Sequence, residues 1–277
     1  MNEKIEKSNA SQSLKKIYEL ADMMEQFPNG KMILLPGDRD WNNGGKGGEK
    51  SLRNLETNIQ KYLKRKGYRQ TKWTIKRGCP GPKVYDINEA LTIVTLNSQW
   101  WNHSFDKPRP ADGLCDAITP ENLKEELEDV VEENQDKNIL IVGHHPIHSL
   151  GHYGGYFSFG DQFKPFPIAG SFRTAFHTNI GGKRDISNEH LNEYVEGMNN
   201  LLFFHSNLIY ASSHEKNQQV IRRGMNFLIN SGAPAKADYV TRDEHTFLSK
   251  KAVGIMAIDY YNLITSKVCL LVAVIVL

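Results

Sequence analysis

Cysteine is scarce in this sequence: only three occur among 277 residues, and no two of them lie close together. Zinc knuckles and dithiol redox motifs need cysteines at short spacing, so the sequence indicates neither kind of site. Cys79 and Cys115 both lie in loop-like segments. They predict either a disulfide, which requires an oxidising compartment, or two free thiols. Cys269 lies in an apolar run, where we expect it to be buried.

A leader sequence and a long hydrophobic run are also missing. Residues Met1–Ser13 are polar and lack the apolar segment of a signal peptide. Val268–Leu277 is almost wholly apolar, but it is much shorter than the roughly twenty residues that span a bilayer. It predicts a buried strand or a membrane segment cut short. The abrupt start and the apolar end predict a fragment, which leaves both export and membrane association through a missing C-terminal region open.

A strong charge of either sign is absent as well. The net charge is +2, with 39% hydrophobic and 24% charged residues, as in ordinary soluble globular proteins. The basic residues between Lys61 and Lys66 are expected on a solvated helix face, and no basic-aromatic pattern accompanies them. We therefore expect no nucleic-acid partner. Asn42–Gly48 is rich in glycine but lacks the Gly-Lys-Ser/Thr of a P-loop, so we expect a flexible loop there.

Hydrophobic periodicity predicts an α/β domain in which helices and strands alternate. Helices are expected over 11–27, over 49–66, from 120 after an N-cap at Thr119, and from 187. Strands are expected over 31–35, 83–87, 91–96, 139–142, 207–211, 253–261 and 267–277, with a hairpin over 218–229. Since no internal repeat or linker is evident, residues 1–277 are expected to form a single domain.

Two segments expected to be loops carry side chains suited to binding. Residues 147–161 combine glycines, aromatic residues and histidines, which indicates either a substrate pocket or a plain surface loop. Residues 171–182 are the second such segment. Arg173, His177 and Arg184, in or near it, indicate either contact with an anion or ordinary solvated side chains.

Three residues of metal-ligand type each follow a short apolar strand, namely Asp38, His144 and His214. Open α/β sheets bind ligands at the carboxyl ends of their strands. Carboxylate and imidazole groups brought together there predict a metal site on the rim of the sheet. The alternatives are a turn in which Asp38 caps the backbone, and a pair of polar residues, His144 and His145, that merely closes a strand.

With these residues in place, the sequence resembles the calcineurin-like metallophosphoesterases, in particular a bacterial branch with Cys-Pro-Gly-Pro and Gln-Trp-Trp segments. The resemblance covers about residues 14–261. The matching segments are Pro36–Trp41, Cys79–Pro82, Gln99–Trp101, Gly143–Pro146, Gly151–Gly155 and Ser213–Asn217. It implies a four-layer α/β/β/α sandwich with helices outside two central sheets, incomplete at the N-terminus. It also implies a dimetal site of iron, manganese or zinc that hydrolyses phosphoesters.

The first half of the chain departs from the family pattern. The family's two N-terminal aspartate motifs are missing. Asp38 replaces an asparagine that ligates metal, and a carboxylate can still ligate. Arg39 stands where the family has the catalytic histidine that protonates the leaving group. A guanidinium binds phosphate but does not release a proton near neutral pH.

The second half keeps more of the pattern. His144 and His214 match metal ligands of the family, and His145 is expected to support His144. Lys216 replaces a further histidine ligand, and together with His152 it is expected around the substrate. Two hypotheses follow: a metal-dependent phosphatase or phosphodiesterase with a degraded dimetal site, or a catalytically inactive relative or gene fragment with a binding role or none. The natural substrate and the compartment stay undetermined.

Overall fold

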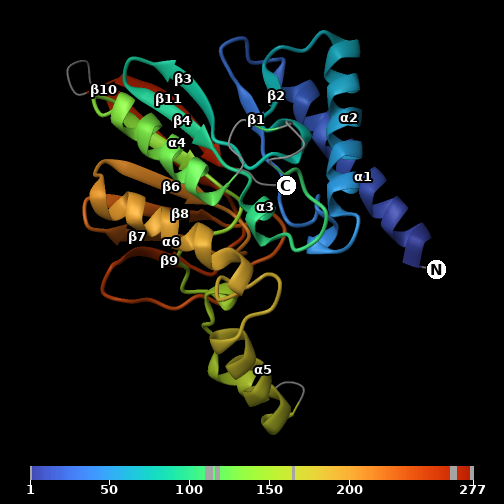
Figure 1. The fold of residues 1–277 in the computed structure, drawn as a ribbon, viewed down its shortest axis with the longest axis vertical. Helices are drawn as coiled ribbons and strands as arrows, with labels where there is room; N and C mark the ends of the chain where they lie inside the picture. Colours follow the sequence, from blue (N-terminus) through green and yellow to red (C-terminus); the bar gives the residue numbers. More distant parts are fainter. Residues whose placement is uncertain (1, 110–114, 116–118, 164–165, 263–266, 275–277) are drawn as a thin grey trace.

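The computed structural model describes residues 2–109, 115, 119–163, 166–262 and 267–274. Its architecture is mixed α/β, built around a seven-stranded sheet with the order β3-β4-β5-β6-β8-β7-β9 (Figure 1). The strands are β3 (Lys83–Asn88), β4 (Leu91–Thr95), β5 (Asn138–Val142), β6 (Leu208–Ser212), β7 (Gln218–Arg223), β8 (Asn226–Ser231) and β9 (Thr246–Lys250). The α/β class expected from the sequence is confirmed.

The four strands β4, β5, β6 and β8 run parallel, and β3, β7 and β9 are added by antiparallel pairing. The carboxyl ends of the parallel strands therefore meet along one edge of the sheet. The predicted hairpin is confirmed, since β7 pairs with β8, and the two strands expected over 83–87 and 91–96 pair as a second hairpin, β3 with β4. The sequence does not predict β9, because its two apolar residues, Phe247 and Leu248, are adjacent and show no alternation.

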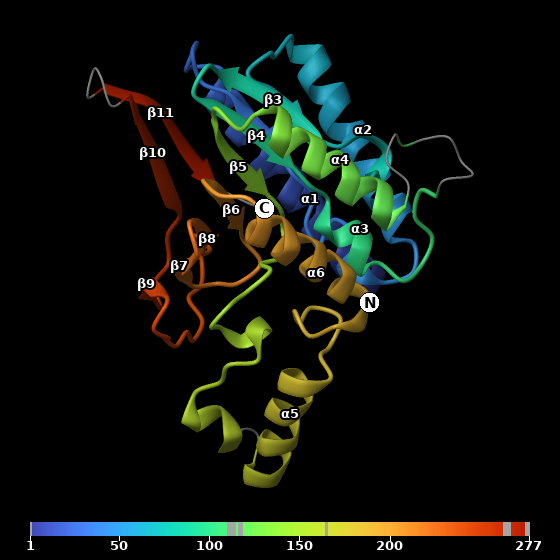
Figure 2. The ribbon, with the colours of Figure 1, turned by 60° about the vertical axis from the view of Figure 1, so that its left-hand side comes forward.

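Two helices, α4 (Pro120–Glu133) and α6 (Glu189–Phe204), cover one face of this sheet (Figure 2). Leu123 of α4 and Leu191 of α6 are buried in the same core cluster as Ile141 of β5. The Thr119 hydroxyl accepts a hydrogen bond from the backbone N–H of Asn122 at 3.1 Å, which confirms the predicted N-cap of α4.

The opposite face is covered by an antiparallel pair, β10 (Met256–Asn262) and β11 (Lys267–Val274), which forms a separate layer in Figure 2. Ile258 of β10 packs against a smaller core cluster that contains Leu140 and Ile229. Both strands are predicted by the sequence, although residues 275–277 of the second one lie outside the described residues. The burial expected for Cys269, in β11, concerns a side chain that is likewise outside the description.

The N-terminal part of the chain forms a layer of its own beside the sheet (Figure 1). Its helices are α1 (Asn2–Met24) and α2 (Gly48–Lys66), and its strands β1 (Met32–Leu34) and β2 (Thr71–Trp73) pair in parallel. Leu52 and Ile59 of α2 are fully buried, together with Trp41 from the turn after β1. The sequence does not predict β2, because three residues are too few to show a period.

The segment expected to be a loop at 171–182 is mostly helical, so that prediction is wrong. Helix α5 (Pro167–Asn179) projects away from the sheet together with the short helical turn η5 (Phe159–Phe163) (Figure 1). The helix begins at Pro167, and its apolar residues Phe172, Phe176 and Ile180 have helical spacing but stay exposed instead of packing on the core. Gly181, with φ of 79°, follows its end.

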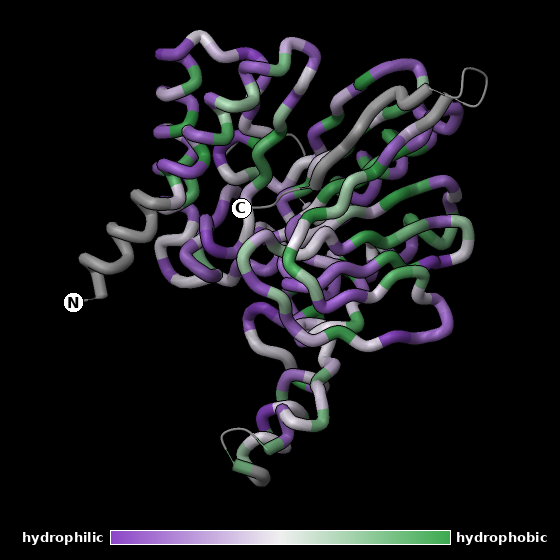
Figure 3. Tube along the Cα trace, turned by 180° about the vertical axis from the view of Figure 1, so that it is seen from behind, coloured by the Kyte–Doolittle hydropathy of each residue, from purple (hydrophilic) through white to green (hydrophobic). Residues whose placement is uncertain are grey.

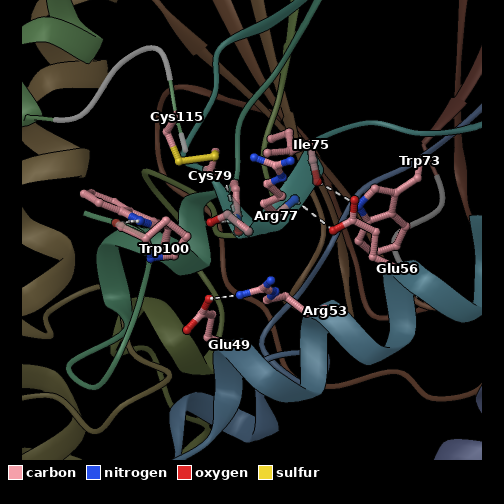
Figure 4. The surroundings of a disulfide bond; sticks show 12 residues. Glu49, Arg53, Glu56, Trp73, Ile75, Arg77, Cys79, Trp100 and Cys115 are labelled. Atoms are coloured by element: carbon pink, nitrogen blue, oxygen red, sulfur yellow. Dashed lines mark hydrogen bonds and ion pairs between the residues drawn. A yellow bond between two sulfur atoms is a disulfide. The ribbon is translucent and has the colours of Figure 1, made fainter. Parts of the chain in front are cut away.

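A disulfide joins Cys79 and Cys115, so of the two sequence alternatives the structure has the bonded one (Figure 4). Cys79 directly follows the helical turn η2 (Lys76–Gly78). The backbone N–H of Arg77 in this turn donates to Glu56 Oε2 of α2 at 2.8 Å. The bridge therefore ties Cys115 to the part of the chain that packs on α2.

Within the described ranges, none of the helices is long and apolar enough to cross a membrane.

Candidate metal centre

Two adjacent parallel strands deliver the histidines of the candidate site. His144 and His145 follow β5, and His214 follows β6, which pairs directly with β5. All three side chains are buried, and their ring centroids lie 4.8–4.9 Å apart. His214 Nδ1 lies 3.0 Å from His144 Nε2. The sheet edge predicted from the sequence therefore does gather these residues.

The three imidazoles are arranged so that a metal ion fits between them. Each of His144, His145 and His214 offers one nitrogen, and these atoms all lie within 4.8 Å of one another. His144 Nδ1 is buried and has no hydrogen-bond partner. A cluster of neutral imidazoles is a donor set that zinc and iron accept well. The residues present therefore fit a divalent transition metal.

Two glycines leave room for His144. A Cβ atom on Gly37 would lie only 2.8 Å from the Cε1 and Nδ1 atoms of the His144 ring. A Cβ atom on Gly143 would collide with the hydroxyl groups of Tyr194 and Tyr210. The turn after β1 and the end of β5 can therefore approach the site closely only because both positions lack a side chain.

Hydrogen bonds with the hydroxyl groups of Ser98 and Tyr210 hold His145 in place. The Ser98 hydroxyl, in helix α3 (Ser98–Asn102), accepts from the backbone N–H groups of His144 and His145. Ser98 Oγ also lies 3.0 Å from His145 Nδ1. The Tyr210 hydroxyl donates to the His145 carbonyl at 2.6 Å. These contacts fix the backbone and the ring plane of His145, so this residue both supports the cluster and contributes to it.

Burial keeps the imidazoles of His145 and His214 uncharged. Burial, and secondly the neighbouring His144, lowers the pKa of His214 to about 3. Burial lowers the pKa of His145 well below its ordinary value, and the adjacent His214 and His144 add to this effect. His214 Nε2 donates to the carbonyl of Arg184 at 2.7 Å, so Nδ1 carries the lone pair. Neutral rings with free lone pairs are the form that binds metal ions.

The backbone of His214 is unusual. Its φ is 61°, in the left-handed region that residues other than glycine seldom adopt. Such conformations cost free energy and cluster at functional sites. Here the conformation accompanies the placement of the His214 ring between His144 and the Arg184 carbonyl.

Asp38 lies at the side of the cluster and is neutralised by an arginine. Asp38 Oδ1 lies 3.3 Å from His144 Nε2, and Asp38 Oδ2 lies 2.6 Å from Arg184 Nε. Burial by itself would raise the pKa of Asp38, but the contacts with His144, His214 and Arg184 outweigh burial and hold it well below its usual value. Asp38 is therefore an ionised, buried carboxylate with one basic partner already in place.

The other site residues expected from the sequence lie further out. Arg39 is exposed on the turn after β1. Lys216 Nζ forms an ion pair with Asp238 Oδ2 at 3.2 Å. His152 Nε2 lies 3.5 Å from Asp161 Oδ2, and its ring stacks on Phe157. Of these residues, His152 and the Lys216 partner Asp238 line a pocket next to the cluster.

This pocket has a volume of about 250 Å³. It is lined by His152, Tyr153, Phe157, Asp161, Arg173, His177, Asp185 and Asp238. The three clustered histidines do not line it directly, but the Tyr153 ring lies 4.2 Å from the His214 ring, centroid to centroid. His177 Nδ1 pairs with the buried Asp185 at 2.6 Å. The pocket therefore adjoins the cluster through Tyr153, and a substrate group fits in it.

Sequence reasoning misses the residues that support the site from a distance. Ser98, Tyr210 and Glu215 carry no spacing that identifies them. Glu215 is buried, and it accepts hydrogen bonds from the Ser149 hydroxyl and the Tyr153 backbone N–H. The position of Glu215 directly after His214 is the one feature of the sequence that points to its role. A buried carboxylate next to a candidate ligand is the kind of group that orders a neighbouring loop.

Comparisons with known proteins do not identify a family for this chain. No family model matches the chain, and no curated protein matches it. A solved structure similar to it is described as "GAP50 the anchor in the inner membrane complex of Plasmodium", with 12% sequence identity and a TM-score of 0.35. The similarity covers 76% of this chain and 58% of that protein, so the chain spans less than two thirds of its length.

Proposed function

We propose that this protein is a metal-dependent phosphoester hydrolase whose active site is the cluster of His144, His145 and His214. The observation that carries the proposal is the convergence of three buried imidazoles at the carboxyl edge of a parallel sheet. Iron, manganese and zinc are the candidate ions. A divalent ion bound there would lower the pKa of a coordinated water and offset charge on a phosphoryl group.

The residues beside the cluster suit a phosphate group. Arg184 pairs with Asp38, and its side chain keeps 36% of its surface exposed, so the guanidinium also faces solvent. Arg39 adds a second exposed guanidinium on the adjoining turn. Guanidinium groups bind phosphate oxygens with two parallel hydrogen bonds. Arg184 would therefore hold the phosphoryl group, in a place where a second metal ion would otherwise supply the charge.

Family membership is part of the same proposal. The segments that resemble calcineurin-like metallophosphoesterases include both histidine-bearing strand ends of this site. The finer fold expected from that resemblance, a four-layer sandwich of two sheets between helices, is supported by the β10–β11 pair. It covers the sheet face opposite α4 and α6, where a second central sheet would lie.

The competing function is that of an inactive relative that binds metal or a partner without turnover. One observation favours it: Asp38 is engaged by Arg184 at 2.6 Å, and Lys216 is engaged by Asp238. Neither Arg39 nor Lys216 supplies an imidazole at the positions where the family has one. Loss of a proton donor for the leaving group would slow hydrolysis of esters with poorly acidic alcohols most strongly.

The test begins with metal binding. The purified chain is stripped with a chelator and titrated with Zn²⁺ and Mn²⁺ by calorimetry. His144→Ala and His214→Ala should each weaken binding by about tenfold or more, because each removes one donor of three. His190→Ala, which alters an exposed histidine of α6, is the matched control and should bind as the parent does.

The second step is turnover of p-nitrophenyl phosphate and bis-p-nitrophenyl phosphate by the metal-loaded protein. Hydrolysis that is lost in His144→Ala and retained in His190→Ala supports the hydrolase. Metal binding without turnover of either ester selects the inactive relative. If neither ion binds, the cluster is structural, the hydrolase is ruled out, and only an inactive relative without a metal remains.

A further inference from the structure

Residues 156–163 and 166–180 form a projection that we call the aromatic lobe. It contains the turn η5 and helix α5, and it extends away from the sheet and from helices α4 and α6 in both ribbon views (Figures 1 and 2). Six of the twelve phenylalanines of the chain lie between residues 157 and 176. The lobe is therefore far richer in aromatic residues than the rest of the protein.

Most of these apolar side chains face solvent. The exposed ones are Tyr156, Phe159, Phe163, Phe166, Phe172, Phe176 and Ile180. Phe159 keeps 75% of its surface exposed and Phe172 keeps 72%. Hydrophobic positions continue to the far end of the lobe in Figure 3. Single exposed apolar residues are common, but a group of seven on one projecting element marks an interaction surface.

The helix arranges part of this group as a stripe. Phe172, Phe176 and Ile180 are spaced by four residues, so they lie one above another on the same face. His177, on a different face, pairs with Asp185 of the protein body. The apolar stripe is therefore the side of α5 that is turned away from its own protein, the reverse of a helix that packs on a core.

The lobe has one acidic residue, Asp161, and the chain beyond it is basic as far as Asp185. Between Asp161 and Asp185 the sequence contains no acidic residue, whereas Lys164, Arg173, Lys183 and Arg184 are basic. The whole chain, by comparison, has 32 acidic and 34 basic residues. A segment that is both aromatic and basic complements a surface that is apolar beneath a negatively charged outer layer.

We propose that the aromatic lobe docks the protein on an anionic lipid surface, with the phenylalanine side chains inserted at the level of the headgroups. Short helices with exposed Phe and Leu and nearby Lys or Arg bind membranes in this way, by apolar burial plus attraction to acidic lipids. A second copy of the chain would bring two basic lobes together, so charge disfavours it. Arg173 and His177 of the lobe also line the pocket beside the histidine cluster, which would then lie close to the lipid surface.

The test uses co-sedimentation of the full chain with vesicles of phosphatidylcholine alone and of phosphatidylcholine mixed with phosphatidylglycerol. The chain should sediment with the mixed vesicles, and binding should weaken as salt is added, because salt screens the basic residues. The double variant Phe172→Ser, Phe176→Ser should lose about tenfold or more of its partitioning, since each ring withdrawn from water contributes a change of that order.

The matched control is Phe203→Ser, Phe204→Ser, which removes two phenylalanines from the end of α6 that are even more exposed than Phe172 and Phe176. It should bind vesicles as the parent does. Circular dichroism establishes that both double variants keep the parent fold, as expected for exposed positions. The proposal is overturned if the parent does not bind the mixed vesicles, if both double variants lose binding equally, or if the lobe variant instead abolishes a dimer seen by light scattering without vesicles.

Discussion

Arg184 Nε lies 2.6 Å from Asp38 Oδ2, and the carbonyl of the same arginine accepts a hydrogen bond from His214. One residue therefore neutralises the carboxylate beside the histidine cluster and also sets which nitrogen of His214 carries the proton. Asp38 is 4% exposed, so its charge needs such a partner. Removing the guanidinium should have opposite effects on stability and on metal binding.

For Arg184→Gln we expect the metal-free protein to lose about 3 kcal/mol of unfolding free energy, because a buried carboxylate loses its partner. Zn²⁺ affinity should rise, because Asp38 then becomes free to attract the cation. Denaturant unfolding and calorimetry measure the two effects. Arg53→Gln, which breaks the exposed pair with Glu49, is the control and should cost less than about 1 kcal/mol. A fall in Zn²⁺ affinity in Arg184→Gln would contradict this account of Asp38.

Gly37→Ala tests how tightly the turn after β1 holds His144. The added methyl would lie 2.8 Å from the imidazole, so the ring or the turn must shift. We expect weaker metal binding and a loss of about 1–3 kcal/mol in stability, as for other overpacked sites. Gly160→Ala is the comparison, because its nearest neighbour would be the Ser158 hydroxyl at 3.9 Å. Equal effects of the two substitutions would show that His144 is not confined by Gly37.

The disulfide predicts a thiol count and a stability change. Protein unfolded without reductant should show one reactive thiol, that of Cys269, and three after reduction. The bridge closes a loop with a sequence separation of 36, so the double variant Cys79→Ser, Cys115→Ser should lose about 4 kcal/mol in the chain-entropy model. Reductant should destabilise the parent and leave this variant unchanged. Three thiols before reduction would rule out the bridge.

His103 makes stability depend on pH. Its ring is buried against Trp41, and burial, aided by Lys107, lowers its pKa to about 4 from an ordinary value of 6.5. The unfolded chain therefore binds this proton at higher pH than the folded protein does. Stability linked to His103 is complete above pH 6.5 and falls as the pH drops toward 4.

Between pH 7 and pH 5 the parent should lose about 2 kcal/mol through this residue. His103→Phe keeps an aromatic ring beside Trp41 and should remove that part of the loss. Urea unfolding of both proteins at the two pH values measures the difference. Identical pH dependence in the parent and in His103→Phe would show that His103 does not titrate as described.

Much of the sheet is evident in the sequence because its signals are local. The apolar runs of β4, β5 and β6, the turns of both hairpins and the Thr119 cap each depend on a few adjacent residues. The same locality places His144 and His214 at strand ends. Since β5 and β6 are parallel neighbours, their ends had to meet, and the cluster of imidazoles follows from that pairing.

The tertiary structure decides what depends on residues far apart in the chain. The pairing of Arg184 with Asp38, the formation of the Cys79–Cys115 bridge in place of two free thiols, and the support of His145 by Ser98 and Tyr210 have no signature in any short window. Helix α5 is likewise not predicted from the sequence, where a loop is expected over 171–182. Its apolar residues Phe172, Phe176 and Ile180 have helical spacing, but only the tertiary structure shows that they face solvent and do not pack on the core.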